Sequence, residues 1–122
     1  MTRTFPGTSP FNSRLMDEAI DVLSKSLGPK WTHLFHRLAI GDYRTRFQIH
    51  SKWNQKEPTD DNARNYKCSL DVLQRWRLSM QQGKQVDESV LLEQLLNTVN
   101  QVKGLQRIAN ELAQRNGKKN NS

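Results

Sequence analysis

The stretch LGPKWTHLFHRLAIGDYRTRFQIHSKW, residues 27–53, contains two short helix signals separated by a tight break. Gly28 suits the left-handed end of a preceding helix, and Pro29 suits the first turn of the next one, where its missing N–H is not needed. Four apolar residues then recur at the spacing of one helix face: Trp31, Leu34, Phe35 and Leu38. The sequence therefore predicts a short helix over residues 30–38 that buries a stripe anchored by tryptophan.

A second short helix is predicted over residues 42–53. The Asp42 carboxylate follows the break and can cap the free N–H groups at the start of this helix. The apolar side chains of the helix fall at Tyr43, Phe47 and either Ile49 or His50. Two helices joined this closely form a corner, which needs other helices to cover its apolar faces.

The sequence predicts further helices before and after the corner, and these can cover its apolar faces. Before it, Ser13 is a candidate N-cap for a helix over residues 14–27. After it, residues 54–65 contain Pro58 and several Asp and Asn residues, which predicts a long exposed loop. Asn65 is then placed to cap a helix that stops at Gly83.

Two further helices complete the set. Asp87 can cap a fifth helix rich in leucine, and Gly104 separates it from a sixth. The pattern predicts an all-α fold, a six-helix antiparallel bundle, as one domain over residues 14–115. Residues 1–13 are expected to be a flexible N-terminal segment and residues 116–122 a disordered tail. The predicted core consists of Leu23, Leu27, Trp31, Leu34, Leu38, Leu73, Trp76, Leu92, Leu96, Ile108 and Leu112.

Composition limits the classes of partner and compartment. The chain has 122 residues, 19 Lys and Arg against 12 Asp and Glu, and a net charge of +7, which admits nucleic acid, an anionic membrane surface or an acidic protein as partner. Cys68 is the single cysteine, so an internal disulfide is impossible, and we interpret it as an ordinary helical thiol. With neither a signal-peptide core nor a membrane span in the sequence, we expect a cytoplasmic protein.

The order of the helix signals resembles a death domain of the six-helix death-fold superfamily. The resemblance covers residues 14–114 and depends on matching positions at Leu27, Gly28, Trp31, Leu34, Leu38, Ile40, Leu73, Trp76, Leu92, Leu96, Leu105, Ile108, Ala109 and Leu112. It implies a Greek-key bundle without catalytic activity or cofactor that assembles homotypically with death domains of receptors or adaptors, self-association included. The predicted long loop and the Trp76-Arg77 pair are most similar to adaptors of the Fas-associated type or to the insect immune-deficiency adaptor. Innate immunity and programmed cell death both remain open as contexts.

Charged side chains are the candidates for such contacts. The first patch lies on the two corner helices and is basic: Arg37, Arg44, Arg46 and Lys52. The first helix carries an acidic edge: Asp17, Glu18 and Asp21. Opposite charges on separate faces would steer two domains together and fix their register. One exposed pair contributes only about 0–1 kcal/mol, so an apolar anchor is also needed.

A second basic group is predicted on and around the fourth helix: Arg64, Lys67, Arg75, Arg77 and Lys84. Its candidate counterparts are Glu88 and Glu93, with Asp87 either a third counterpart or occupied as a cap. Arg75 and Arg77 diverge by roughly 200° around a helix, so they cannot share a face. One of the two is expected to be structural, packed beside Trp76.

Alternatives to a protein-interaction domain are weaker in the sequence. His33 and His36 could ligate a metal, but no third ligand stands at helical spacing, so we interpret them as surface or half-buried imidazoles. Trp53 could be core or surface. The sequence contains neither a nucleophile–base pair nor a phosphate loop, so we expect neither an enzyme nor a small-molecule substrate. The alternative function is a basic helical nucleic-acid-binding domain, although its Lys and Arg are spread over three helices. Binding to a membrane surface would require one strongly basic amphipathic helix, which the sequence does not contain. No membrane insertion is expected.

Overall fold

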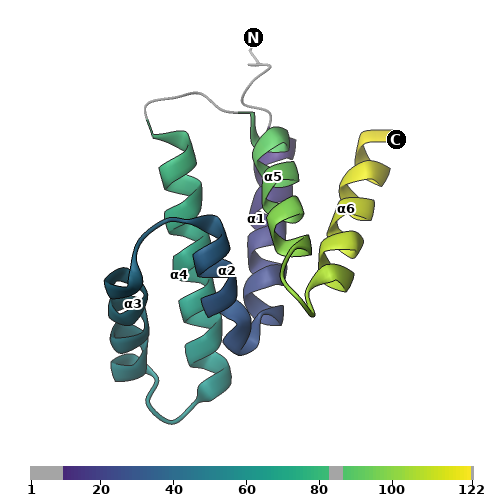
Figure 1. Ribbon diagram of the computed structural model, residues 1–122. Helices are drawn as coiled ribbons and strands as arrows, with labels where there is room; N and C mark the ends of the chain where they lie inside the picture. The colour runs from purple at the N-terminus through teal and green to yellow at the C-terminus, as the bar shows by residue number, and fades with distance from the viewer. Residues whose placement is uncertain (1–9, 83–86, 122) are drawn as a thin grey trace.

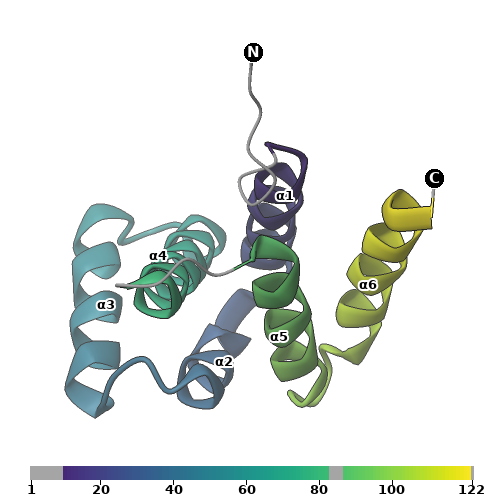
Figure 2. The same cartoon turned by 90° about the horizontal axis from the view of Figure 1, so that it is seen from above.

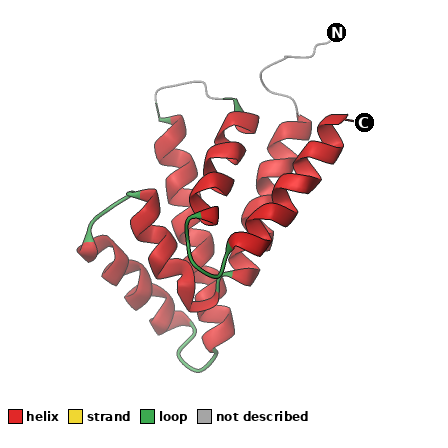
Figure 3. Cartoon of the chain, turned by 45° about the vertical axis from the view of Figure 1, so that its right-hand side comes forward, coloured by secondary structure: helices red, strands yellow, loops and turns green. Residues whose placement is uncertain are grey.

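The computed structural model describes residues 10–82 and 87–121, and the side chains of residues 15–82 and 87–115. Within these ranges the chain is all-helical, which confirms the predicted fold class of six helices without strands (Figure 3). The helices are α1 (Pro10–Ser26), α2 (Trp31–Leu38), α3 (Tyr43–Lys56), α4 (Asp61–Gln81), α5 (Glu88–Asn100) and α6 (Gln106–Asn121), with a 3-10 turn η2 (Gly28–Lys30) before α2.

The helices form an antiparallel bundle with one peripheral member. α1 packs against α4, and α5 packs against α6, each pair running in opposite directions (Figure 1). α1 also contacts α5 and α6, so it lies centrally. α3 lies at the edge of the molecule and packs on α4 (Figure 2). One long side of α3 is therefore left to solvent, and the candidate site lies on it.

The core is continuous through the bundle and contains both predicted tryptophan anchors. Trp31 of α2 is 2% exposed and Trp76 of α4 is 5% exposed. Of the predicted core residues, Leu38 and Ile108 are only partly buried and pack against the outside of the core. Side chains of this size each stabilise the fold by about 1.5–3 kcal/mol when fully buried, which explains why the apolar stripes fix the packing.

Side-chain caps set three of the helix starts. Asp42 Oδ1 accepts hydrogen bonds from the N–H groups of Arg44 at 3.0 Å and Thr45 at 3.2 Å. Asp87 accepts one from the N–H of Ser89 at 2.9 Å. Both caps confirm the sequence interpretation. Gly28 has φ +55°, the left-handed conformation expected where α1 and its last turn end.

The predicted long loop between the third and fourth helices is wrong. α3 continues to Lys56 and α4 begins at Asp61, so the connection contains only four residues. The cap of α4 is Asp60, whose carboxylate accepts a hydrogen bond from the N–H of Ala63 at 3.0 Å, and not the predicted Asn65. Pro58 stops α3 but leaves the polar residues on either side of it free to be helical.

Two other boundaries differ from the prediction. α1 begins at Pro10, so Ser13 lies inside the helix and not at its cap, because proline is well tolerated in a first helical turn. α6 continues to Asn121 through residues predicted to be disordered. Once a helix has nucleated, each added residue gains one backbone hydrogen bond, and no proline interrupts residues 116–121. Most of the N-terminal segment, the stop at Gly83 and Ser122 lie outside the described residues.

Candidate protein-interaction surface

The exposed side of α3 combines aromatic and cationic side chains. Tyr43 is 67% exposed and Phe47 is 63% exposed. They stand four residues apart, so they share a face of the helix. No acidic residue occurs in α3, whereas Arg44, Arg46, Lys52 and Lys56 all do. The sequence analysis grouped Tyr43 and Phe47 with the apolar side chains of this helix, but of those candidates only Ile49 is buried.

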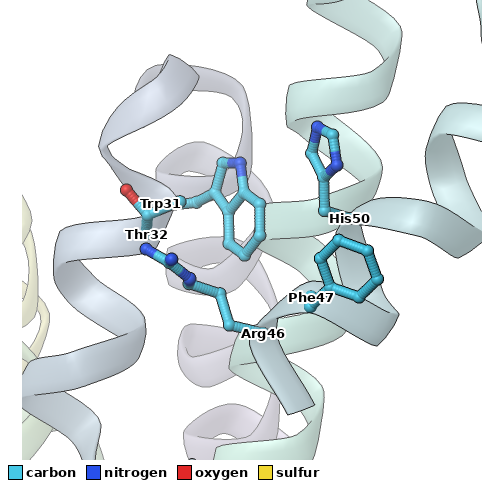
Figure 4. Close-up of a pocket in the computed structure, with 5 residues that line it drawn as sticks. All are labelled: Trp31, Thr32, Arg46, Phe47 and His50. Atoms are coloured by element: carbon cyan, nitrogen blue, oxygen red, sulfur yellow. The ribbon is translucent and has the colours of Figure 1, made fainter. Parts of the chain in front are cut away.

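A hollow of about 260 Å³ lies between α2 and α3 on this face. It is lined by Trp31, Thr32, Arg46, Phe47 and His50 (Figure 4). The Trp31 and His50 rings are stacked at a centroid distance of 6.5 Å and an interplanar angle of 11°. In Figure 4 the Arg46 side chain reaches from α3 toward Thr32 on α2. The hollow is thus an apolar depression with a cation at its rim.

The first predicted basic patch is divided by the structure. Arg44 is exposed beside the aromatic face, and the Arg46 guanidinium lies 4.8 Å from the centroid of the Tyr43 ring. Lys52 is nine residues from Tyr43, which places it roughly 180° away around the helix. Arg37 lies on α2, where its Nη1 donates a hydrogen bond to Gln101 at 3.5 Å. Arg44 and Arg46 stand roughly 200° apart around the helix, so they flank the aromatic pair from its two sides, and the other two cations do not join them.

Trp53 anchors the opposite side of α3 to α4. Its Nε1 donates a hydrogen bond to Asp71 Oδ2 at 2.9 Å, and Lys52 lies 3.7 Å from the same carboxylate oxygen. Three ammonium groups approach the Trp53 ring at 4.8, 5.4 and 5.7 Å from its centroid, those of Lys52, Lys56 and Lys67. Cations in this position are attracted to the face of an indole. The ambiguous tryptophan is thus a half-buried contact between two helices.

Asp71 is held in its charged form by this contact. Burial by itself raises the pKa of Asp71, but hydrogen bonds from Arg75 and Trp53, together with the charges of Arg75 and Lys52, outweigh it. The pKa of Asp71 therefore lies below its ordinary value. Arg75 Nε donates to Asp71 Oδ1 at 2.6 Å, so this arginine of the second basic group already has a partner within its own helix.

The acidic edge predicted on α1 is also engaged inside the molecule. Asp17 accepts a hydrogen bond from Arg77 at 2.6 Å. Asp21 pairs with Lys25 at 3.0 Å and accepts a hydrogen bond from the Tyr66 hydroxyl at 3.1 Å. The hydrogen bond from Lys25 is the main reason why the pKa of Asp21 lies below its usual range. Glu18, the third predicted member, is exposed on the same helix.

Arg77 is the structural arginine of the Arg75–Arg77 pair. Its side chain is 15% exposed and joins three helices by pairing with Asp17 of α1 and Glu88 of α5. Burial alone lowers the pKa of Arg77, but the two carboxylates raise it above its usual value. Gln81 adds a hydrogen bond to Glu88 at 3.0 Å. Arg77, Asp17 and Glu88 therefore hold the bundle together at this point.

The remaining predicted residues have separate positions. Arg64 is 16% exposed, pairs with Asp61 and donates to the carbonyl of Glu57 at 3.0 Å, which closes the short connection before α4. Glu93 is exposed on α5, and Lys84 lies outside the described residues. The structure thus does not assemble the second basic group into one patch. The sequence signal that pointed to part of this surface was the basic patch predicted on the two corner helices.

The histidines of α2 and the single cysteine have separate surroundings. His33 and His36 are both exposed, and no group of three or more His, Cys, Asp or Glu side chains in the described part of the chain could hold a metal ion. Cys68 is buried, and desolvation, with a smaller contribution from the charge of Asp71, raises the pKa of its thiol to about 11. The thiolate needed for nucleophilic chemistry is therefore scarce at neutral pH. Among the described helices, none is long and apolar enough to cross a bilayer.

The fold and surface define a class: a small all-helical domain with an exposed aromatic and basic face. No protein-family model, curated protein or solved structure matches the chain.

Proposed function

We propose that this chain is an adaptor domain of the death-domain type, which binds the death domains of receptors or other adaptors in intracellular signalling. Innate immunity and programmed cell death are the two contexts that the sequence resemblance implies. The observation that carries the proposal is the exposed face of α3, where Tyr43 and Phe47 stand beside Arg44 and Arg46. The six-helix architecture supports it, because the resemblance requires that number of helices.

The chemistry of this face suits a protein partner. Exposed aromatic side chains with an adjacent arginine are the residues most often found at the energetic centre of protein interfaces. Arg44 and Arg46 add long-range attraction to an acidic partner, which raises the association rate and fixes orientation more than it raises affinity. Assemblies of such domains grow when one face meets a different face on the next molecule.

A panel of purified death domains from receptors and adaptors tests the proposal. We expect at least one domain to bind the wild-type chain, and the variant Arg44→Glu to lose that binding with its circular dichroism spectrum unchanged. The matched control is Arg107→Glu, the same charge reversal on an exposed arginine of α6. Binding by no member of the panel, or equal binding by both variants, would contradict the proposal.

Nucleic-acid binding is the second candidate, and the absence of acidic residues from α3 is the observation that favours it. A helix of this charge contacts phosphates electrostatically, so its affinity would fall steeply with salt. Titration with random duplex DNA over a salt series separates the two proposals. Tight binding with a steep dependence on salt would favour the nucleic-acid proposal. Weak binding at physiological salt would favour the protein-partner proposal.

A further inference from the structure

We propose that the hollow between α2 and α3 receives one large apolar side chain from an acidic segment of a different protein. This inference rests on the proposed function, because it names the partner chemistry of the same surface. Three observations carry it: the shape and lining of the hollow, the charge around it, and the engagement of the chain's own carboxylates elsewhere.

The hollow has the size and lining of an anchor site. Trp31 forms its buried side, and Phe47 and His50 contribute rings from α3 (Figure 4). A cavity of ~150 Å³ already accommodates a benzene ring in another protein. The volume here, about 260 Å³ and open to solvent, therefore has room for one Leu, Phe or Trp side chain.

The charge around the hollow selects an acidic partner. Arg46 lines the hollow itself, and Arg44 lies two residues before it on the exposed side of the helix. Nothing acidic in α3 offsets these two cations. A carboxylate beside the entering side chain could pair with Arg46, while Arg44 on the other side of the aromatic pair adds longer-range attraction. Such charge complementarity sets which partners are accepted.

A second copy of this chain does not supply these carboxylates. Six of its twelve acidic residues are in ion pairs within the molecule: Asp17, Asp21, Asp61, Asp71, Glu88 and Glu111. Three others cap helix starts: Asp42, Asp60 and Asp87. Docking them onto α3 of another copy would break contacts that already stabilise the fold. The remaining three, Glu18, Glu57 and Glu93, lie on or beside three different helices and form no acidic segment, so we assign the occupant to a different chain.

Selection from a phage-displayed library of random peptides on the full chain tests this inference. We expect enrichment of peptides in which Asp or Glu residues flank one Leu, Phe or Trp. Binding of a synthetic copy of the most enriched peptide, measured by fluorescence anisotropy, should weaken about thirtyfold in Phe47→Ala, as for truncation of an interface hot spot. It should be unchanged in Leu78→Ala, a control at an exposed leucine of α4.

Failure of this inference is distinguishable from failure of the proposed function. A library that yields no acidic, apolar-anchored peptides, or a peptide whose affinity is equal in Phe47→Ala and wild type, would overturn the hollow as an anchor site. If death-domain binding were then lost in Arg44→Glu but retained in Phe47→Ala, the proposed function would stand alone. Self-association of the wild-type chain in light scattering at low salt, abolished by Phe47→Ala, would overturn the assignment to a different chain.

Discussion

Truncation of Arg77 should destabilise the bundle although this residue resembles a surface charge in the sequence. Arg77→Ala leaves Glu88, which is 12% exposed, without its cation, whereas Asp17 is 66% exposed and can return to water. Removal of one partner from a fully buried pair costs about 3–5 kcal/mol. Because one carboxylate is solvated and Glu88 keeps its hydrogen bond from Gln81, we expect a loss of about 2 kcal/mol in the free energy of unfolding.

Urea unfolding followed by circular dichroism measures this loss at pH 7. The matched control is Arg75→Ala, two residues away. Arg75 is half-exposed, and its partner Asp71 keeps the hydrogen bond from Trp53 when the arginine is removed. That control should lose less than about 1 kcal/mol, because Asp71 also keeps Lys52 as a cation at 3.7 Å. The addition of Glu88→Gln to Arg77→Ala should recover part of the loss, since the uncompensated charge is gone. Equal losses in the two arginine variants would refute the structural role of Arg77.

Three further outcomes follow from local contacts. Because the pKa of Asp71 is lowered in the fold, its charged form stabilises the folded state above the unfolded pKa of about 3.9. In urea titrations, Asp71→Asn should therefore lower the free energy of unfolding by about 1 kcal/mol at pH 7, and this loss should shrink as the pH falls through the folded pKa. Native Cys68 should resist a thiol reagent at pH 8 and react once denatured, whereas rapid native labelling would contradict its burial. Ala39 has φ +55°, so Ala39→Gly should raise the free energy of unfolding by about 0.5 kcal/mol, whereas Ala113→Gly on α6 should lower it.

The fold class could be predicted because local and global signals agree in this sequence. The stripe at Trp31 and the break at Gly28 are set by residues only a few positions apart, so they can be read without tertiary information. The Asp42 cap is local in the same way. The fourth helix start was wrong because Asp60 and Asn65 are both good caps, and packing of the helix on α1 and α3 decides between them.

The candidate site was predictable only in part. The sequence identified the charge of the corner helices but not which cations share a face with the exposed aromatic rings. It also assigned Arg77 and Asp17 to separate docking patches, since residues 60 positions apart show no sign of their pairing in the sequence. The exposed ring of Phe47 was missed for a related reason: periodicity identifies an apolar residue but not whether another helix covers it.

Chemical-shift mapping of the isotope-labelled chain, titrated with an acidic death domain from the panel, asks where the partner binds. We predict that the amides of Tyr43–His50 and the indole N–H of Trp31 shift together, because the docking face that we propose consists of α3 and the hollow. Shifts confined to α5 and α6, with α3 unchanged at saturation, would contradict the assignment of function to this surface.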